Sequence, residues 1–175
     1  MENGGIIRRI DELGRIVIPK EMRKSLRINV GDKMEICASL DGIVLKKRSG
    51  YESIMNIVKE VSKTLAFYTK ADVIALGSSD VVYSAGERKN DYIGGAASGV
   101  LLGAISNRKE VVLHGDDLKR AFDNVECSRA YLVFQPIVVD GDSLGGLALL
   151  LDTFPSDLTR SYLKFVAELI EDSLK

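Results

Sequence analysis

One stretch near the amino end, LGRIVIPKEMRK at residues 13–24, constrains the fold of this chain more than any other. Gly14 supplies the backbone freedom that a tight turn requires, and the β-branched residues 16–18 favour a short strand. Pro19 ends that strand and suits the first turn of a helix, where its missing N–H has no partner to lose. The stretch therefore predicts a turn, a strand and a helix in direct succession.

The residues on either side extend this pattern into a small module. Residues 33–38 alternate polar and apolar side chains, which is the period of a strand with one buried face. Asp41-Gly42 is a strong hairpin signal. The predicted module has the order ββαββ, with strands at 6–10 and 15–18, a helix at 19–26, and strands at 33–38 and 43–47.

This module is too short to bury an adequate core by itself, because the buried fraction of a chain's surface falls with its length. Its predicted strands are nonetheless apolar. The sequence also shows neither a disulfide framework nor a metal-ligand spacing that would staple so small a fold. We therefore expect residues 1–50 to complete their core against a second copy, as a homodimer.

Charge is divided unevenly along the chain. Residues 1–50 carry 11 Lys and Arg against 7 Asp and Glu, a net charge of +4, whereas residues 51–175 carry 13 against 18, a net charge of −5. Such an asymmetry indicates a basic module that meets a polyanion, followed by an acidic module with another role. A second interpretation stays open, because basic runs often form no more than a solvated surface.

Residues 51–175 predict a second module in which helices alternate with pairs of strands. Apolar residues at spacings of three and four indicate amphipathic helices at both of its ends, and short turns between successive strands make the sheet mainly antiparallel. Gly95, Gly99 and Gly103 would form one close-packed face within a helix. The expected elements are helices at 51–68, at 91–107 with interruptions, and at 154–175, and strands at 71–76, 81–85, 110–114, 131–139 and 144–151.

Residues 7–23, IRRIDELGRIVIPKEMR, together with 32–36 and 42–47, resemble the N-terminal DNA-binding domain of the AbrB family of transition-state regulators. The resemblance implies a swapped-hairpin β-barrel, in which two ββαββ units interleave. It also carries over the family's DNA-facing side chains, to which we add Arg9 and Lys20 on charge and position. The expected DNA-binding residues are Arg8, Arg9, Arg15, Lys20, Arg23 and Lys24.

The second module resembles the GAF-type domain that follows the DNA-binding domain in one branch of this family. The resemblance rests on QPIVVDGD at 135–142 and LGGL at 144–147, which are similar to a late hairpin of that fold. It implies a GAF-like α/β/α arrangement, and hence an α+β chain, that forms a homotetramer. It also implies a pocket for a small-molecule effector. Arg88, Lys89 and Asp91 are candidates for its lining, with solvated loop residues as the alternative.

These resemblances imply a regulator that activates and represses sporulation genes through A/T-rich promoter DNA, in the cytoplasm and associated with the nucleoid. Phosphate neutralisation is expected to dominate its affinity, and DNA shape and deformability to supply part of its specificity. Two alternatives stay open. In one, the arginines form surface ion pairs with Asp11, Glu12 or Glu21. In the other, the chain is a small-molecule-sensing GAF protein whose barrel serves a protein partner, in the manner of an antitoxin.

Other classes of function find little support in the residues. The glycine-rich run at 94–99 is followed by Val-Leu where a phosphate loop requires Lys and Ser or Thr. Cys37, Cys127 and the single His114 give no metal-ligand spacing and no catalytic triad, so we expect no enzyme, no metal and no cofactor. No apolar run approaches the roughly 20 residues of a membrane span, and the start lacks the pattern of a secretory signal, which favours a cytoplasmic protein.

Overall fold

The computed structural model of the chain describes residues 5–28, 30, 32–47 and 54–174. Packing divides the chain into two compact units, Met1–Asp32 and Lys33–Lys175. The predicted boundary at residues 48–50 lies outside the described residues, so a division into domains 1–50 and 51–175 stays a prediction. Each unit is described below by itself.

The first unit is built around a tight turn and one short helix. The turn after Asp11 places Gly14 at φ +77°, and the Asp11 N–H donates a hydrogen bond to the Arg15 carbonyl at 3.0 Å. Helix α1, Lys20–Ser25, begins directly after Pro19. The turn and the proline-opened helix that the sequence predicts are therefore confirmed.

The two strands predicted at residues 6–10 and 15–18 are not formed, and this part of the prediction is wrong for the single chain. Both segments lie outside any strand ladder, although they flank a hydrogen-bonded turn. A two-stranded ribbon is marginal by itself, because its stability depends on a further strand or a packed face. Within this unit, the part of the chain that the structure describes supplies no third strand.

The second predicted hairpin is present. Strand β1, Met34–Ser39, pairs antiparallel with β2, Gly42–Lys47, and Met34 lies opposite Lys47. The tight connection between the strands confirms the hairpin that Asp41-Gly42 predicts.

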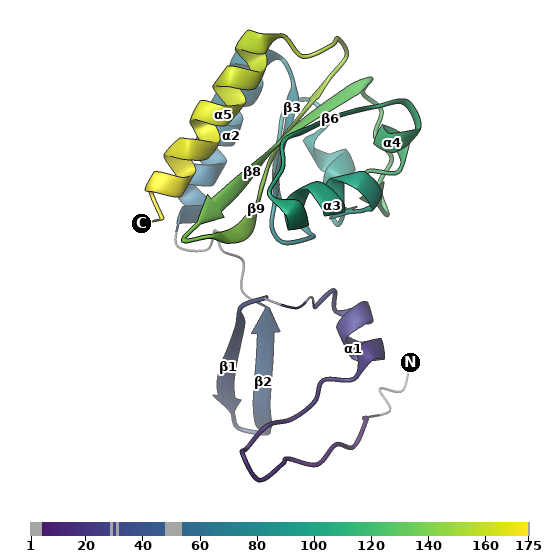
Figure 1. Cartoon of the computed structure of the whole chain (residues 1–175), viewed down its shortest axis with the longest axis vertical. Coiled ribbons are helices and arrows are strands. Elements are labelled where there is room, and N and C mark those ends of the chain that lie inside the picture. Colours follow the sequence, from purple (N-terminus) through teal and green to yellow (C-terminus); the bar gives the residue numbers. More distant parts are fainter. Residues whose placement is uncertain (1–4, 29, 31, 48–53, 175) are drawn as a thin grey trace. The chain divides into compact units, whose positions relative to one another are not determined.

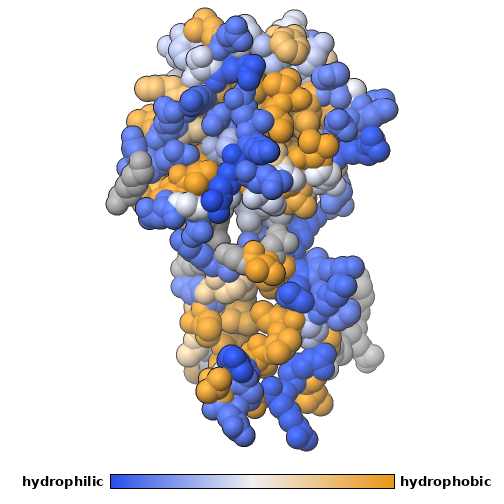
Figure 2. All heavy atoms as spheres, in the orientation of Figure 1, coloured by the Kyte–Doolittle hydropathy of each residue, from blue (hydrophilic) through white to orange (hydrophobic). Residues whose placement is uncertain are grey.

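Apolar side chains are unusually exposed in the first 47 residues. Figure 2 shows them gathered at the surface in the N-terminal part of the chain. Pro19 is the only buried residue among the described residues from 5 to 47. The large apolar side chains with 40% or more of their surface exposed are Ile6, Ile7, Ile10, Leu13, Ile16, Val17, Met22, Leu26, Val30, Ile36, Leu40, Ile43, Val44 and Leu45.

The second unit also contains a five-stranded sheet in the order β4-β3-β9-β8-β6 (Figure 1). Every neighbouring pair in this sheet is antiparallel, which confirms the sheet type that the short turns predict. The strands are β3 (Asp72–Leu76), β4 (Val81–Ala85), β6 (Val111–His114), β8 (Tyr131–Val139) and β9 (Asp142–Leu151).

Helices cover both faces of this sheet and give two apolar cores. Helices α2 and α5 lie side by side on one face, and α3 and α4 lie on the other (Figure 1). Strand β3 supplies both cores, because Val73 and Ala75 point to the first face while Ile74 and Leu76 point to the second. The helices are α2 (Met55–Thr69), the 3-10 helix η2 (Lys89–Tyr92), α3 (Gly99–Asn107), α4 (Gly115–Lys119) and α5 (Asp157–Asp172).

The interruptions predicted in the helix at 91–107 are present, and only its later part, α3, is α-helical. The segment 91–107 contains the end of η2, a two-residue strand, β5 (Ala96–Ala97), that pairs with β7 (Phe122–Asp123), and then α3. Positive φ angles of +79° at Gly94 and +49° at Gly99 explain the interruptions, since such a backbone leaves the right-handed helix.

The predicted glycine face is wrong. Gly95 lies before α3, where an added Cβ would meet a methyl group of Val125 at 2.9 Å. Gly103 is inside α3, and nothing lies within 4 Å of the position of its missing Cβ. The glycines therefore do not share one packed face.

Candidate nucleic-acid interface and effector site

The turn of the first unit holds Arg15 through one carboxylate. Asp11 Oδ1 accepts the backbone N–H groups of Leu13 and Arg15, at 3.0 and 2.8 Å, and Oδ2 accepts the Arg15 Nε at 2.7 Å. The hydrogen bonds from the Arg15 backbone and side chain hold the pKa of Asp11 below its ordinary value. Arg15, one of the predicted DNA-binding residues, thus lies on a turn that Asp11 stabilises through these hydrogen bonds.

Three further predicted cations share one side of α1. Lys20, Arg23 and Lys24 are related by spacings of three and four residues, which bring side chains to the same helix face. All three are exposed, and α1 buries none of its residues. Like charges at these spacings repel one another, so binding of a polyanion to this helix face would relieve the repulsion.

The remaining two predicted cations, Arg8 and Arg9, lie in the extended segment before the turn. Both are exposed, and Arg8 Nη1 lies 3.4 Å from the Ile7 carbonyl oxygen. All six predicted DNA-binding side chains therefore project to solvent from the same unit.

The ion-pair alternative is realised for Arg15. Its guanidinium lies 2.7 Å from Asp11, and both side chains are largely exposed. Exposed pairs of this kind contribute little to stability, and salt screens them. A DNA phosphate competes well against such a partner, so the pair and a DNA contact are compatible.

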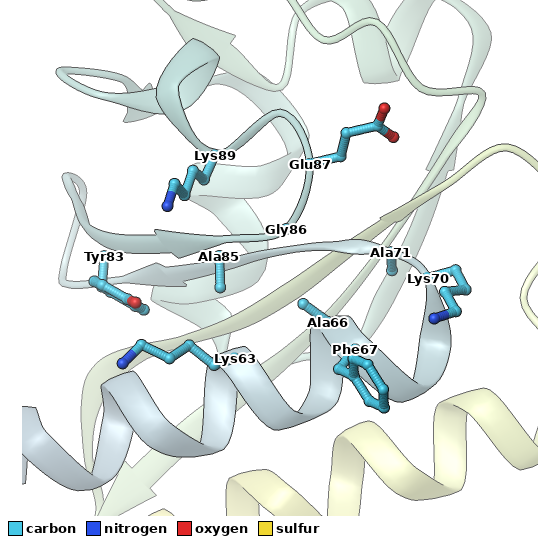
Figure 3. Close-up of a pocket in the computed structure, with 10 residues that line it drawn as sticks. All are labelled: Lys63, Ala66, Phe67, Lys70, Ala71, Tyr83, Ala85, Gly86, Glu87 and Lys89. Carbon is cyan, nitrogen blue, oxygen red and sulfur yellow. The ribbon is translucent and has the colours of Figure 1, made fainter.

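The three candidate effector residues do not gather at one place. Arg88 Nη1 donates to the Ser128 carbonyl at 3.0 Å, which ties two loops together. Asp91 is exposed on η2. Lys89 is the one of the three that lines a surface cavity of about 420 Å³ beside α2 and β4. Figure 3 shows its ammonium group turned toward Tyr83.

A buried ion pair behind this cavity escaped the sequence analysis. The Asp72 side chain is fully buried, and its Oδ2 accepts the Arg129 Nε at 2.7 Å. Its Oδ1 accepts the Arg88 N–H at 2.9 Å. The hydrogen bond to Asp72 also raises the pKa of Arg129. A carboxylate at the start of the apolar strand 71–76 was the available signal.

Chemistry elsewhere in the chain is sparse. Cys37 and Cys127 are free thiols, both half-buried, and burial raises the pKa of the Cys127 thiol. His114 is exposed beside Tyr131. Within residues 5–28, 30, 32–47 and 54–174, no group of three or more His, Cys, Asp or Glu is placed to hold a metal ion. In the same residues, no helix has the length and apolarity to cross a membrane.

Known proteins match this chain in two ways, some over the amino-terminal part alone and one over most of its length. Residues 7–52 match the family model described as antidote-toxin recognition MazE, bacterial antitoxin. Over 150 residues the chain is 31% identical to stage V sporulation protein T of Bacillus subtilis (strain 168), which covers 85% of this chain and 84% of that protein.

Two shorter relatives match the amino-terminal part alone. The transition state regulatory protein AbrB of B. subtilis is 49% identical over 47 residues, or 27% of this chain and 49% of that protein. The putative transition state regulator Abh of the same organism is 47% identical over 47 residues, or 27% of this chain and 51% of that protein.

Among solved structures, the free methionine-R-sulfoxide reductase of type II from Thermoplasma acidophilum aligns with 68% of this chain and 93% of its own. The TM-score is 0.49 and the sequence identity is 13%.

An exposed basic turn and helix at the amino end, followed by an antiparallel sheet with helices on both faces, define a two-part chain of the regulator class. The chain belongs to the AbrB family of regulators, as its motif predicts, and its likeness to stage V sporulation protein T extends through both parts.

Proposed function

We propose that this chain is a DNA-binding transcription regulator that grips A/T-rich promoter DNA with the basic surface of a dimeric amino-terminal barrel. The observation that carries the proposal is the exposure of all six cations on the turn, the extended segment and one face of α1. Phosphate contacts of this kind position a protein on DNA. The name of stage V sporulation protein T supports the further proposal that the regulated genes act in sporulation. We also propose that the chain both activates and represses these genes, in association with the nucleoid.

The exposed apolar surface of residues 5–47 supports dimerisation. Large apolar side chains are a normal surface feature when they are scattered, but a contiguous exposed set marks an interaction site. The segments 6–10 and 15–18 also lack the neighbouring strands that would pair their backbone. A second copy of the same segments supplies both, which is the arrangement of a swapped-hairpin barrel. We propose that residues 1–50 form this homodimer.

DNA contact by this surface rests mainly on phosphate neutralisation. Each neutralised phosphate contributes about −0.9 to the slope of log K against log salt concentration. Lys24 serves as a point charge for a phosphate, because lysine lacks the bidentate geometry of arginine. Arginine inserted into a narrow minor groove favours A/T-rich segments, so part of the specificity comes from DNA shape.

The test replaces two cations together. In the full chain, Arg15→Ala with Arg23→Ala should weaken binding to an A/T-rich duplex by about a hundredfold or more at low salt. The salt slope should become shallower by about 3–4, at about 0.9 for each cation that a dimer loses. Fluorescence anisotropy across salt concentrations measures both quantities.

The matched control is Lys119→Ala with Lys164→Ala, which removes the same charge from exposed positions of the second unit. It should leave the affinity within about twofold. If the Arg15 and Arg23 variant binds like the unaltered chain while remaining dimeric by ultracentrifugation, the DNA face is assigned to the wrong residues.

We also propose a homotetramer formed through the second unit. The predicted apolar side of the last helix divides into two faces in the structure. Leu163, Ala167 and Ile170 pack on the sheet. A second stripe with the spacing of one helix face remains 44–63% exposed, and it consists of Leu158, Tyr162, Phe165 and Leu169. A second copy that covers this stripe joins two dimers.

Tyr162→Glu with Phe165→Glu should convert the tetramer to a dimer, because burying two carboxylates against an apolar surface is strongly unfavourable. Sedimentation velocity of the full chain measures the change. Lys164→Glu lies on the same helix outside the stripe and should leave the tetramer intact. A double variant that stays tetrameric would contradict this interface.

A second candidate function is favoured by the description of the matching family model. Residues 7–52 match an antitoxin domain, so the barrel could serve a protein partner in place of DNA, with the second unit as a small-molecule sensor. A dimeric chain that fails to bind any duplex at low salt would favour this alternative over the regulator.

A further inference from the structure

The second unit contains a cavity that takes no part in the proposed DNA binding. It lies between the carboxyl half of α2, strand β4 and the turn that follows β4, and its volume is about 420 Å³ (Figure 3). This volume lies within the range of about 300–1,000 Å³ that is typical of small-molecule sites.

Positive charge surrounds the cavity although the surrounding module is acidic. Lys63, Lys70 and Lys89 line it, whereas residues 51–175 together carry a net charge of −5. The Lys63 ammonium group donates a hydrogen bond to Glu60 Oε1 at 2.7 Å, which offsets much of its charge, so Lys70 and Lys89 supply most of the positive charge. Lys70 Nζ lies 4.5 Å from the centre of the Phe67 ring. The cavity is therefore a local attractor for anions.

The one carboxylate on the lining turns away from these cations. Glu87 points out of the cavity in Figure 3 and is largely exposed, and its Oε2 lies 3.9 Å from Arg129 Nη2 on the other side of the turn. The Glu87 carboxylate thus lies closer to Arg129 than to the lysines of the lining, and it leaves the positive potential of the cavity in place.

Small and aromatic side chains give the cavity its shape. Ala66, Ala71 and Ala85 leave the hollow, because none of them fills the space between the helix and the strand. Phe67 on α2 and Tyr83 on β4 also line the cavity, and their rings lie well apart, toward its two ends (Figure 3). An apolar floor with aromatic flanks suits a flat ring, while the ammonium groups suit an oxyanion at its edge.

The turn that carries Lys89 is held in place from behind. Gly86 adopts φ +114°, and a Cβ there would lie 2.5 Å from Asp72 Oδ1. The same oxygen accepts the Arg88 N–H, and Ser84 Oγ donates to the Lys89 carbonyl at 2.7 Å. A lining segment fixed by a buried carboxylate needs little rearrangement to bind a ligand.

We propose that this cavity binds a small planar molecule that carries a phosphate or carboxylate group, with the ring on the alanine floor and the anion beside Lys70 or Lys89, which lie at opposite ends of the cavity (Figure 3). The inference deepens the effector part of the proposed function and rests on it for its regulatory meaning. The binding itself is independent of DNA.

The test reads the alanine methyl groups of the lining. Methyl-TROSY spectra of the full chain, labelled at alanine methyls, are recorded with adenosine 5′-monophosphate, with indole-3-acetate and with uncharged adenosine. The signals of Ala66, Ala71 and Ala85 should move with at least one of the two anions and much less with adenosine, while Ala167, buried beside the sheet in α5, should not move. The two anions distinguish phosphate from carboxylate recognition.

Lys70→Gln with Lys89→Gln should weaken anion binding by about tenfold or more, since the loss of one charge-assisted contact costs at least that much affinity. Lys119→Gln with Lys164→Gln is the control and should change nothing. The proposal is overturned if neither anion moves the three lining signals, or if the Lys70 and Lys89 variant binds as well as the control.

DNA affinity is measured separately on the same samples. Loss of DNA binding with intact methyl shifts would overturn the regulator and leave the ligand site standing. Intact DNA binding without methyl shifts would overturn the ligand site and leave the regulator standing.

Discussion

Asp72→Ala is expected to lower the free energy of unfolding of the second unit by about 3–5 kcal/mol, the cost typical of breaking a buried ion pair from one side. The Asp72 side chain has no exposed surface, and the Arg129 side chain is 7% exposed. The variant leaves that guanidinium with less compensation and the Arg88 N–H without its acceptor. Such a loss is a large share of the 5–15 kcal/mol that stabilises an ordinary domain.

Urea unfolding of the full chain, followed by far-ultraviolet circular dichroism at one protein concentration, measures the effect. Asp152→Ala is the matched control, because Asp152 binds the same guanidinium at 2.5 Å from a position that is 62% exposed. It should cost at most about 1 kcal/mol. Equal losses for the two variants would show that burial of Asp72 is not what makes its ion pair important.

Gly145→Ala should be comparably severe, with a loss of about 3–5 kcal/mol from overpacking and backbone strain together. Gly145 lies in β9 at φ +120°, a conformation that side chains disfavour, and its added Cβ would overlap the carbonyl oxygens of Leu76 and Gly77. Those oxygens belong to the end of β3 and the residue after it, so the substitution forces apart the central strands of the sheet.

Gly141→Ala separates the two causes. Gly141 lies in the turn of the same hairpin at φ +84°, with nothing within 4 Å of its missing Cβ. Its substitution should cost about 1–2 kcal/mol from the backbone conformation alone. Thermal unfolding of both variants at one concentration gives the comparison, and a Gly145 variant as stable as the Gly141 variant would show that the overlap is relieved by a small shift.

The parts of the fold that local chemistry decides could be predicted from the sequence. Asp41-Gly42 and Asp140-Gly141 both mark hairpins that the structure contains, and φ is positive at Asp140 and Gly141, as a two-residue hairpin turn prefers. Pro19 marks the start of α1 for a similarly local reason. The exposure of the six cations also follows from their charge, although their contacts with DNA remain a prediction.

The features of the structure that the sequence did not predict also have physical explanations. The segments 6–10 and 15–18 are apolar enough for strands, but a strand needs a neighbour that one copy of the chain does not provide. Interruptions in the helix at 91–107 are expected, but their positions are not, because they fall at glycines whose φ angles no periodicity reveals. Asp72 and Arg129 are 57 residues apart, so only the folded sheet brings them together.

The bare apolar surface of residues 5–47 has a consequence for dosage. If two chains must meet before either can complete its barrel, the amount of DNA-competent protein rises with the square of chain concentration while dimers are scarce. Halving synthesis then reduces promoter occupancy about fourfold in that regime. The same amino-terminal residues that form the proposed DNA-binding surface would thereby make the response steep.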